Sequence, residues 1–309
     1  MIADLIVAGI DVSKARLDIH VAPSGQVLSV DNNRSGLAGL IKQLRRLGVQ
    51  QVALEASGGY EREAVRRLSQ AGFATHVVPP ARVRALARAM GRSAKTDPID
   101  AATIAHYLML APATPVHQPD PDRERLEELA SLRRQLVAER NKHVSRLDTA
   151  SDPTVRQMLT NMLDSTKAYI ARLDREIARH IRSTPLKERY NRLIAVPGVG
   201  PVLAATLLCD LPELGHASPK QLASLVGVAP HARQSGKTTR AGRCTGGRTS
   251  VRNVLYMATL SAIKAKAPAL RPFYDRLRSN GKPFKLAITA TMRKFLTILH
   301  AIVKQSTVA

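Results

Sequence analysis

Short β-branched runs alternate with helical patterns over the first third of the chain, and this alternation constrains the fold more than any other feature. The chain opens with LIVAGIDV, LDIHVA and QVLSVD, which are separated by turn sequences and predict three consecutive strands. A helical pattern follows and ends at Gly48. QVALEA and ATHVVP then predict two further strands, each followed by a helical pattern.

Three strands in succession, followed by alternating helices and strands, are typical of an RNase H-like (RuvC-like) α/β domain. We predict that residues 1–112 form this domain. A Pro-rich linker, APATPVHQPDPD, closes it. The 309 residues leave room for about two domains in all.

After the linker, residues 113–187 are almost entirely helical in pattern, with an interruption near Asp152 and Pro153. Their apolar positions form a narrow stripe rather than a broad core face, which favours a helical hairpin or coiled-coil arm. We expect such an arm to serve self-association. An ordinary pair of surface helices packed on the body is a nearly equal alternative.

Residues 188–309 predict a helical C-terminal domain, so the fold class is α/β plus all-α. IAVPGVGPVLAATL joins two helical patterns and resembles a helix-hairpin-helix, in which the N–H groups around Gly198 and Gly200 would hold a DNA phosphate. A tight turn without a ligand is the alternative. A Gly- and Arg-rich loop follows, and three helices are expected to end the chain, over residues 251–265, 269–278 and 285–303.

The chain has a formal net charge of +23, and the charge is unevenly distributed. Residues 216–309 hold 17 Lys and Arg against one acid, Asp275, whereas residues 1–215 have a net charge of only +7. A folded chain with this surplus is expected to bind a polyanion, most often nucleic acid. Since aromatic residues are only 3% and Trp is absent, phosphate contacts should dominate over base stacking.

Other partners and compartments are less favoured. Apolar runs stay below the ~18 residues of a membrane span, and the N-terminus has no basic segment before its apolar stretch, so we expect neither a membrane anchor nor a signal peptide. Cys209 and Cys244 stand far apart, which argues against disulfide scaffolds, zinc fingers and iron–sulfur clusters. We expect a bacterial cytoplasmic, nucleoid-associated protein.

Four carboxylates form a candidate metal site. Asp11 and Glu55 end predicted strands, and Asp97 and Asp100 share one face of the first turn of a helix. Together they would hold two Mg²⁺ (or Mn²⁺) ions about 4 Å apart for phosphoryl transfer. Singly, each has a plainer explanation, as a helix-start residue or a solvated strand end. Nearby alternatives are Asp4, Asp18, Glu61 and Glu63.

The chain contains, in this order, GIDVSK, VALEASGGYE, KTDPIDAATIA, IAVPGVGPVLAATL, GVAPHARQSGK and GGRTSVRNVLYMATL. With these motifs, nearly the whole chain resembles the DEDD transposases of the IS110 family of insertion sequences. The resemblance implies a RuvC-like domain, a coiled-coil arm and a C-terminal transposase domain. It also implies a homo-oligomeric recombinase, dimer to tetramer, guided by a non-coding bridge RNA that pairs with donor and target double-stranded DNA.

The resemblance further assigns the DEDD tetrad to Asp11, Glu55, Asp97 and Asp100, and the nucleophile to Ser235. A serine hydroxyl needs activation, which the acidic site of the same or another subunit would supply. From the residues alone, the favoured interpretation of Ser235 is a plain loop serine in a Gly-rich phosphate-binding turn. Of the other serines, Ser250 is expected to cap a helix beginning at residue 251, and Ser13 to serve a turn.

Basic residues without an interleaved acid surround Ser235, and this favours phosphate binding over a merely solvated surface. They are Arg233, Lys237, Arg240, Arg243, Arg248 and Arg252.

Three classes of function therefore remain to be compared. The leading hypothesis is an RNA-guided recombinase, or transposase, that cuts and rejoins DNA through Ser235 with Mg²⁺ at the acidic site. The alternatives are a RuvC-like junction endonuclease that hydrolyses DNA, and a non-catalytic nucleic-acid-binding scaffold. Tyrosine recombinases are disfavoured, because no Arg and His-x-x-Arg constellation accompanies Tyr256 and Tyr274.

Overall fold

The computed structural model describes residues 5–91, 97–110, 120–235 and 238–304. For residues 97–99, 231–235 and 238–241 it gives the backbone but not the side chains. Contacts divide the chain into two compact units, Met1–Asp120 and Pro121–Ala309. The boundary between them falls inside the predicted Pro-rich linker. The finer division into segments 1–112, 113–187 and 188–309 stays a prediction.

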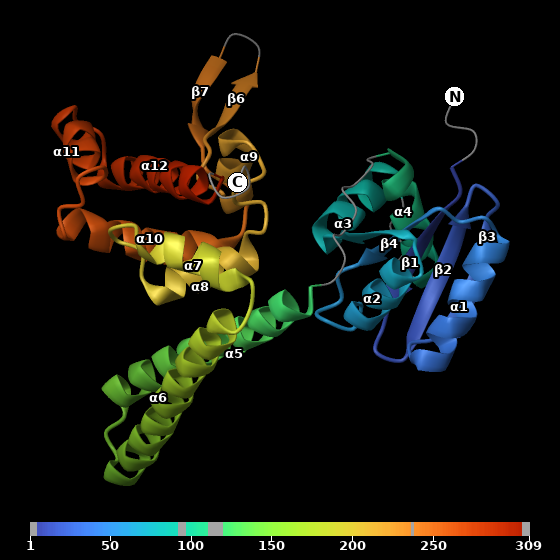
Figure 1. Cartoon of the computed structure of the whole chain (residues 1–309), viewed down its shortest axis with the longest axis horizontal. Coiled ribbons are helices and arrows are strands. Elements are labelled where there is room, and N and C mark those ends of the chain that lie inside the picture. Colours follow the sequence, from blue (N-terminus) through green and yellow to red (C-terminus); the bar gives the residue numbers. More distant parts are fainter. Residues whose placement is uncertain (1–4, 92–96, 111–119, 236–237, 305–309) are drawn as a thin grey trace. The chain divides into compact units, whose positions relative to one another are not determined.

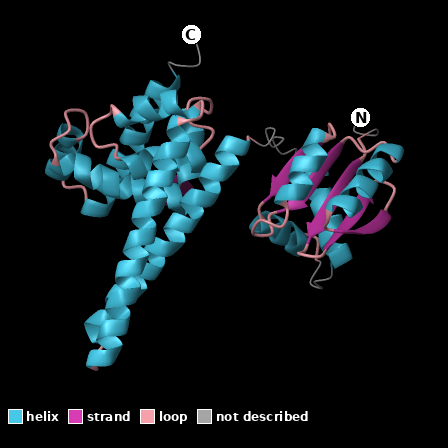
Figure 2. Ribbon diagram, turned by 60° about the horizontal axis from the view of Figure 1, so that its bottom comes forward, coloured by secondary structure: helices cyan, strands magenta, loops and turns pink. Residues whose placement is uncertain are grey.

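The first unit is built on a mixed five-stranded sheet of order β3-β2-β1-β4-β5 (Figures 1 and 2). β1, β2 and β3 pair antiparallel, whereas β4 and β5 continue from β1 in parallel. This strand order and these directions are those of an RNase H-like domain, as predicted. The strands are β1 Val7–Val12, β2 Arg16–Ala22, β3 Gln26–Asp31, β4 Gln51–Glu55 and β5 Ala74–Val78.

Helices cover both faces of this sheet. On one face, leucines of α1 (Arg34–Arg46) and α2 (Arg62–Gln70) pack with the apolar side chains of β1, β2 and β4. On the other face, α3 (Pro80–Ala89) and α4 (Asp97–Leu110) pack on a smaller cluster of strand residues. The alternation of side chains along each strand therefore sorts them into an α1/α2 face and an α4 face.

The second unit begins with a long helical hairpin, α5 (Pro121–Thr149) and α6 (Pro153–Arg182) (Figure 1). Asp152 caps α6 by accepting a hydrogen bond from the N–H of Val155, at 2.9 Å. This confirms the predicted hairpin and its interruption near Asp152, while its role in self-association stays a prediction. At its base the hairpin contributes Leu126, Ala130, Ile177 and Ile181 to the core of the unit.

The rest of the second unit is a cluster of helices (Figure 1). Within it, α8 is buried along the whole of residues 203–209. Of the described helices, only α12 is long and apolar enough to cross a membrane, and half of its apolar window is buried in the unit. The helices are α7 Leu186–Ile194, α8 Pro201–Asp210, α9 Pro219–Val226, α10 Thr249–Lys264, α11 Arg271–Ser279 and α12 Phe284–Lys304.

The segment predicted as a Gly- and Arg-rich loop contains a two-stranded antiparallel hairpin, β6 (His231–Ser235) and β7 (Thr238–Arg243). The prediction of a loop was wrong over these two strands. Both strands are polar, so they lack the apolar–polar alternation by which a half-buried strand is recognised. Their pairing is instead carried by backbone hydrogen bonds.

Candidate functional site

Helix α4 lies directly against strand β1, and Gly9 makes this approach possible. A Cβ atom at Gly9 would overlap the backbone of Ala101 and Ala105. Farther along the helix, Ile104 and Leu108 pack in the same cluster as Val7. Later α4 residues thus meet earlier β1 residues, and α4 runs antiparallel to β1. Its first turn therefore lies toward the carboxyl end of β1.

Asp11 and Glu55 point to the same face of the sheet as α4. Gly9 faces α4 and pairs across the sheet with Ala53. Asp11 and Glu55 each lie two residues farther along these neighbouring parallel strands, and residues two apart share a face. Glu55 also pairs with Val78, which belongs to the cluster packed against α4. The two carboxylates therefore stand side by side at the carboxyl edge of the sheet.

Asp100 completes this arrangement from the helix. It lies in the first turn of α4, immediately before Ala101, whose backbone meets Gly9. Asp97 begins the same helix one turn earlier, and its side chain is outside the described residues. Sheet and helix thus bring Asp11, Glu55 and Asp100 to one edge of the first unit.

The described carboxylates alone do not form a complete metal-binding site. Among the side chains that the structure describes, no three His, Cys, Asp or Glu groups lie close enough together to hold a metal ion. Asp11 accepts a hydrogen bond from the N–H of Val12, at 3.0 Å. Asp11, Glu55 and Asp100 are all half-buried. They offer only oxygen donors, the ligands that Mg²⁺ prefers.

Glu61, considered above as an alternative metal ligand, organises the turn that follows Glu55. It accepts hydrogen bonds from the N–H groups of Ser57 and Gly59 and from the hydroxyl of Ser57, at 3.1, 2.8 and 2.8 Å. Burial raises the pKa of Glu61, but hydrogen bonds from its own backbone N–H and from Ser57 and Gly59 outweigh that effect, so the pKa is lowered. The sequence signal for this role is the spacing of Ser57 and Glu61, which stand four residues apart directly after a strand.

The other alternative acids also have partners or lie outside the described region. Glu63 makes hydrogen-bonded ion pairs with Arg66 and Arg67 on its own helix. Asp18 pairs across the sheet with Asp11 and lies 3.6 Å from Arg16. Asp4 is among the residues that are not described.

Ser235 is the last residue of β6 and pairs with Thr238 of β7, so it stands at the tip of the hairpin. Its side chain is outside the described residues. Ser13, by contrast, bridges the β1–β2 turn through bonds between its hydroxyl and the backbone of Arg16, both at 2.9 Å, which confirms a turn role. Ser250 lies inside α10, whose N-cap is Arg248, so the prediction of Ser250 as N-cap was wrong.

The basic residues around Ser235 differ in their surroundings. Arg243 is exposed at the end of β7. Arg252 donates to the carbonyl of Gly246 and to the hydroxyl of Thr249. For Arg233 and Arg240, a backbone pair across the hairpin, the side chains are not described, and Lys237 lies wholly outside the described residues.

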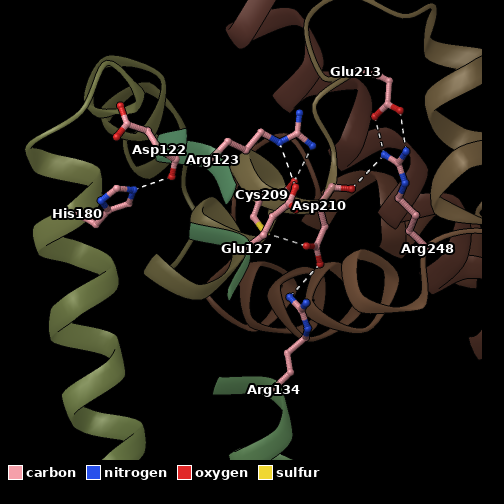
Figure 3. A network of polar contacts seen from close by, with 9 residues as sticks. All are labelled: Asp122, Arg123, Glu127, Arg134, His180, Cys209, Asp210, Glu213 and Arg248. Atoms are coloured by element: carbon pink, nitrogen blue, oxygen red, sulfur yellow. Dashed lines mark hydrogen bonds and ion pairs between the residues drawn. The ribbon is translucent and has the colours of Figure 1, made fainter. Parts of the chain in front are cut away.

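Arg248 has a role that its place in a basic cluster did not suggest. Its guanidinium binds both carboxylate oxygens of Glu213, at 2.5 and 2.6 Å, and donates to the carbonyl of Asp210 at 3.0 Å (Figure 3). This intramolecular engagement differs from the predicted phosphate contact. A phosphate at Arg248 would have to compete with a bidentate carboxylate.

Gly198 and Gly200 also differ from each other. Gly198 has φ +93°, and a Cβ there would press on Ala262 and approach the ring of Phe295, so it serves close packing between helices. Gly200 is the exposed N-cap of α8 and has open space around its Cα. No side chain caps this helix, and its first residue, Pro201, has no N–H group.

Two family models match the chain. A model of DEDD transposases of IS110 elements, described as transposase, matches residues 8–152. A second, described as transposase of the IS116/IS110/IS902 family, matches residues 190–275.

Individual proteins are also similar to this chain. The pilin gene-inverting protein of Moraxella bovis is 28% identical over 313 residues, which cover 96% of this chain and 95% of the relative. The insertion element IS900 uncharacterized 42 kDa protein of Mycobacterium paratuberculosis is 31% identical over 40% of this chain and 33% of its own length. Among solved structures, T. thermophilus RuvC in complex with Holliday junction substrate aligns with 36% of this chain and 99% of that one, at 17% identity and a TM-score of 0.29.

Proposed function

This chain belongs to the IS110 family of insertion-sequence transposases, and from that premise we propose that it is an RNA-guided recombinase with Ser235 as its nucleophile. The enzyme cuts and rejoins donor and target DNA. The observation that carries the proposal is the convergence of Asp11, Glu55 and the first turn of α4 at one edge of an RNase H-like sheet.

The acidic edge suits a divalent metal in the chemistry of its donors. Asp11, Glu55, Asp97 and Asp100 would supply carboxylate oxygens alone, the donor type that Mg²⁺ or Mn²⁺ takes in phosphoryl-transfer sites. Such an ion would assist deprotonation of the attacking oxygen and offset charge on the leaving one. The half-buried positions of Asp11, Glu55 and Asp100 limit their exposure to bulk water, which strengthens any such interaction.

Ser235 would act in a reversible exchange. Its Oγ attacks a DNA phosphorus, gives up its proton to a base, and forms a phosphoserine ester as the bond from phosphorus to a deoxyribose oxygen breaks. A deoxyribose hydroxyl from another strand then attacks the same phosphorus and releases the serine. Since one ester replaces another at each step, rejoining needs no external energy source. In the sequence Gly236 follows the serine, and a residue without a side chain suits close approach by a bulky phosphate.

The nucleic-acid partners follow from charge and from the family resemblance. Residues 216–309 hold 17 bases and one acid, which suits binding to phosphate backbones. The resemblance to the family implies a bridge RNA partner and a homo-oligomer, from dimer to tetramer. Guided pairing assigns the choice of target to the RNA and leaves the chain to bind backbone and perform strand exchange.

The test is covalent adduct formation on matched donor and target DNA, with Mg²⁺ and the non-coding RNA of the element, analysed under denaturing conditions. Wild type should form a protein–DNA adduct that Ser235→Ala and Asp11→Asn both abolish. Asp18→Asn is the matched control, because Asp18 pairs with Asp11 on the same face but lies beside Arg16. It should retain the adduct.

Different outcomes would contradict different parts of the proposal. Cleavage without an adduct, persisting in Ser235→Ala and lost in Asp11→Asn, would replace the serine mechanism with hydrolysis by a RuvC-like endonuclease. Full activity without the RNA would contradict the proposal that an RNA guides the enzyme. Nucleic-acid binding with no cleavage under any condition would leave a scaffold protein.

A further inference from the structure

The two ends of the β6–β7 hairpin are held together by glycines at its base. A Cβ at Gly227, which has φ +77°, would overlap the carbonyl oxygen of Gly246 and the guanidinium of Arg252. A Cβ at Gly247 would likewise overlap the backbone of Val226 and Gly227. The chain entering the hairpin and the chain leaving it thus touch backbone to backbone, with no space for side chains between them. We call residues 225–229 and 244–248 the hairpin base.

Arg248 ties this base to the body of the unit. Its backbone N–H donates to the carbonyl of Leu225 at 2.7 Å, which joins the two halves of the base. Its guanidinium crosses to Glu213 and to the carbonyl of Asp210, at distances of 2.5 to 3.0 Å (Figure 3). One residue therefore links the hairpin base to the segment after α8.

The far end of this link is rigidly held. α8 ends at Asp210, and Cys209 beside it is fully buried. Arg123 of α5 donates to the carbonyl of Cys209 at 3.0 Å, and Arg134 of α5 pairs with the carboxylate of Asp210 at 3.0 Å (Figure 3). Arg123 and Arg248 thus bind the carbonyls of Cys209 and Asp210 at the carboxyl end of α8, where helix carbonyls lack intrahelical partners, and Arg134 binds the side chain of Asp210. The hairpin base is thus fixed to a buried helix end.

These contacts favour a positioning role for Arg248 over a phosphate contact. Its side chain is 35% exposed and that of Glu213 is 33% exposed, so the pair is partly shielded from water. A bidentate guanidinium–carboxylate pair fixes orientation as well as distance. If Arg248 bound a DNA phosphate instead, the Glu213 carboxylate would lose its ion-pair partner and the hairpin base would lose its link to α8.

We propose that the Arg248–Glu213 pair is a positioning pair that fixes the direction of the hairpin carrying Ser235. This rests on the proposed function, since it gives Ser235 the role of nucleophile. The pair touches no substrate. It acts by holding the hairpin base against the end of α8, so that the tip meets the DNA phosphate at a constant angle.

The sharpest test removes Glu213 and keeps the cation at Arg248. For Glu213→Ala, the positioning role predicts that adduct formation slows by on the order of 10²-fold, the effect of a small misplacement of reacting groups. It also predicts unchanged affinity for DNA and RNA, and faster hydrogen exchange in the amides of β6 and β7. A phosphate-binding role for Arg248 predicts instead an undiminished adduct rate, with affinity for nucleic acid that is equal or higher. That result would overturn the proposal.

The matched control is Glu188→Ala, which removes the partner of Arg192 at 2.6 Å from an exposed pair within α7. It should leave the adduct rate unchanged. Arg248→Lys keeps the charge but loses the bidentate geometry, so it should show the same slow adduct formation. It replaces Glu213→Ala as the test if that variant does not fold. Glu213→Gln, which keeps one acceptor, should recover part of the rate.

Failure of this proposal and failure of the proposed function have different signatures. If Ser235→Ala keeps the adduct, the serine mechanism falls and the pair has nothing to position. If Ser235→Ala loses the adduct while Glu213→Ala and Arg248→Lys both keep the wild-type rate, the serine mechanism stands and the positioning pair is wrong. A fall in DNA affinity for Glu213→Ala that matches the fall in adduct rate would also contradict it.

Discussion

At the scale of single residues, Gly9 has an influence on the acidic edge although it carries no functional group. The backbone of α4 occupies the volume that a side chain at residue 9 would fill. This close approach sets how far Asp100 stands from Asp11 and Glu55. The spacing of the candidate metal ligands is therefore a property of packing as well as of the ligands themselves.

Gly9→Ala should consequently destabilise the protein and lower its activity together. We expect a cost of about 1–3 kcal/mol in the free energy of unfolding, typical of overpacking a core. Gly39→Ala is the control, since Gly39 is exposed in α1 with open space around it. There the better helix propensity of Ala should stabilise by about 0.5–1 kcal/mol. Urea unfolding measures both, and equal effects would contradict the close-approach argument.

At the scale of elements, the β6–β7 hairpin depends on its base more than on its strands. Its strands are polar and pair only with each other. An isolated two-stranded hairpin is at best marginally stable in water. The glycines and Arg248 at its base therefore supply the constraint that pairing alone does not.

Gly227→Ala should show the cost of disturbing that base. It combines left-handed backbone strain with an overlap onto Gly246 and Arg252. Gly281→Ala is the matched control, because Gly281 has φ +70° but open space, so it carries the strain alone. We expect Gly227→Ala to destabilise by about 1–3 kcal/mol more than the control. It should also slow adduct formation, which Gly281→Ala leaves unchanged. Thermal unfolding and the adduct assay check this.

The Glu213 carboxylate makes the same base sensitive to acid. Burial raises its pKa, but hydrogen bonds from Arg248 and the backbone, with the charge of Arg248, lower it below the ordinary 4.5. A lowered pKa stabilises the folded state above about pH 4.5, and this stabilisation is lost as the pH falls through the folded-state value. Wild type should therefore lose more stability than Glu213→Gln between about pH 6 and pH 3. Equal losses would show that the pair adds nothing.

The sequence predicted elements well where their apolar residues have a clear period. The strands of the first unit, the α5–α6 hairpin and the last three helices all carry such a pattern, and their positions agree within a few residues. The β6–β7 hairpin was missed because HARQS and TTRAGR have no apolar face. Pairing between two polar segments depends on backbone groups, which every residue except proline shares, so composition does not reveal it.

The sequence also predicted some features of the candidate site and missed others. Asp11, Glu55 and Asp100 were placed correctly at strand ends and a helix start, because position along an element follows from local pattern. The roles of Arg248 and Glu61 were not foreseen. Arg248 meets Glu213, 35 residues earlier in the chain, and only the packing of α8 against α10 brings them together. A run of basic residues looks uniform in sequence, whereas each guanidinium has its own neighbours in the fold.

At the scale of the molecule, the α5–α6 arm and the C-terminal helices share one core in the second unit. Leu126 is fully buried, and Leu193, Leu207 and Phe295 belong to the same cluster. The arm is therefore no appendage attached at its ends. Its base is a structural part of the unit that carries Ser235.

Leu126→Ala should for this reason destabilise the arm base and the C-terminal helices equally, so that both still unfold in one transition. The expected cost is about 2–5 kcal/mol, as for other buried Leu→Ala changes. Leu132→Ala is the control on the same helix, since Leu132 is 47% exposed, and it should cost far less. Hydrogen exchange resolved along the chain measures both. Loss of protection in α5 alone, with α8 and α12 unaffected, would contradict a shared core.

This shared core decides where segments can be exchanged between relatives. A chimaera cut at the ends of the arm, near residues 121 and 182, would bring foreign side chains into a cluster that Leu126, Ala130, Ile177 and Ile181 complete. Crossovers placed inside the helices, beyond Ala130 in α5 and before Ile177 in α6, would leave that cluster native and transplant only the distal arm. The useful recombination points for engineering therefore lie within helices, where domain boundaries are not usually sought.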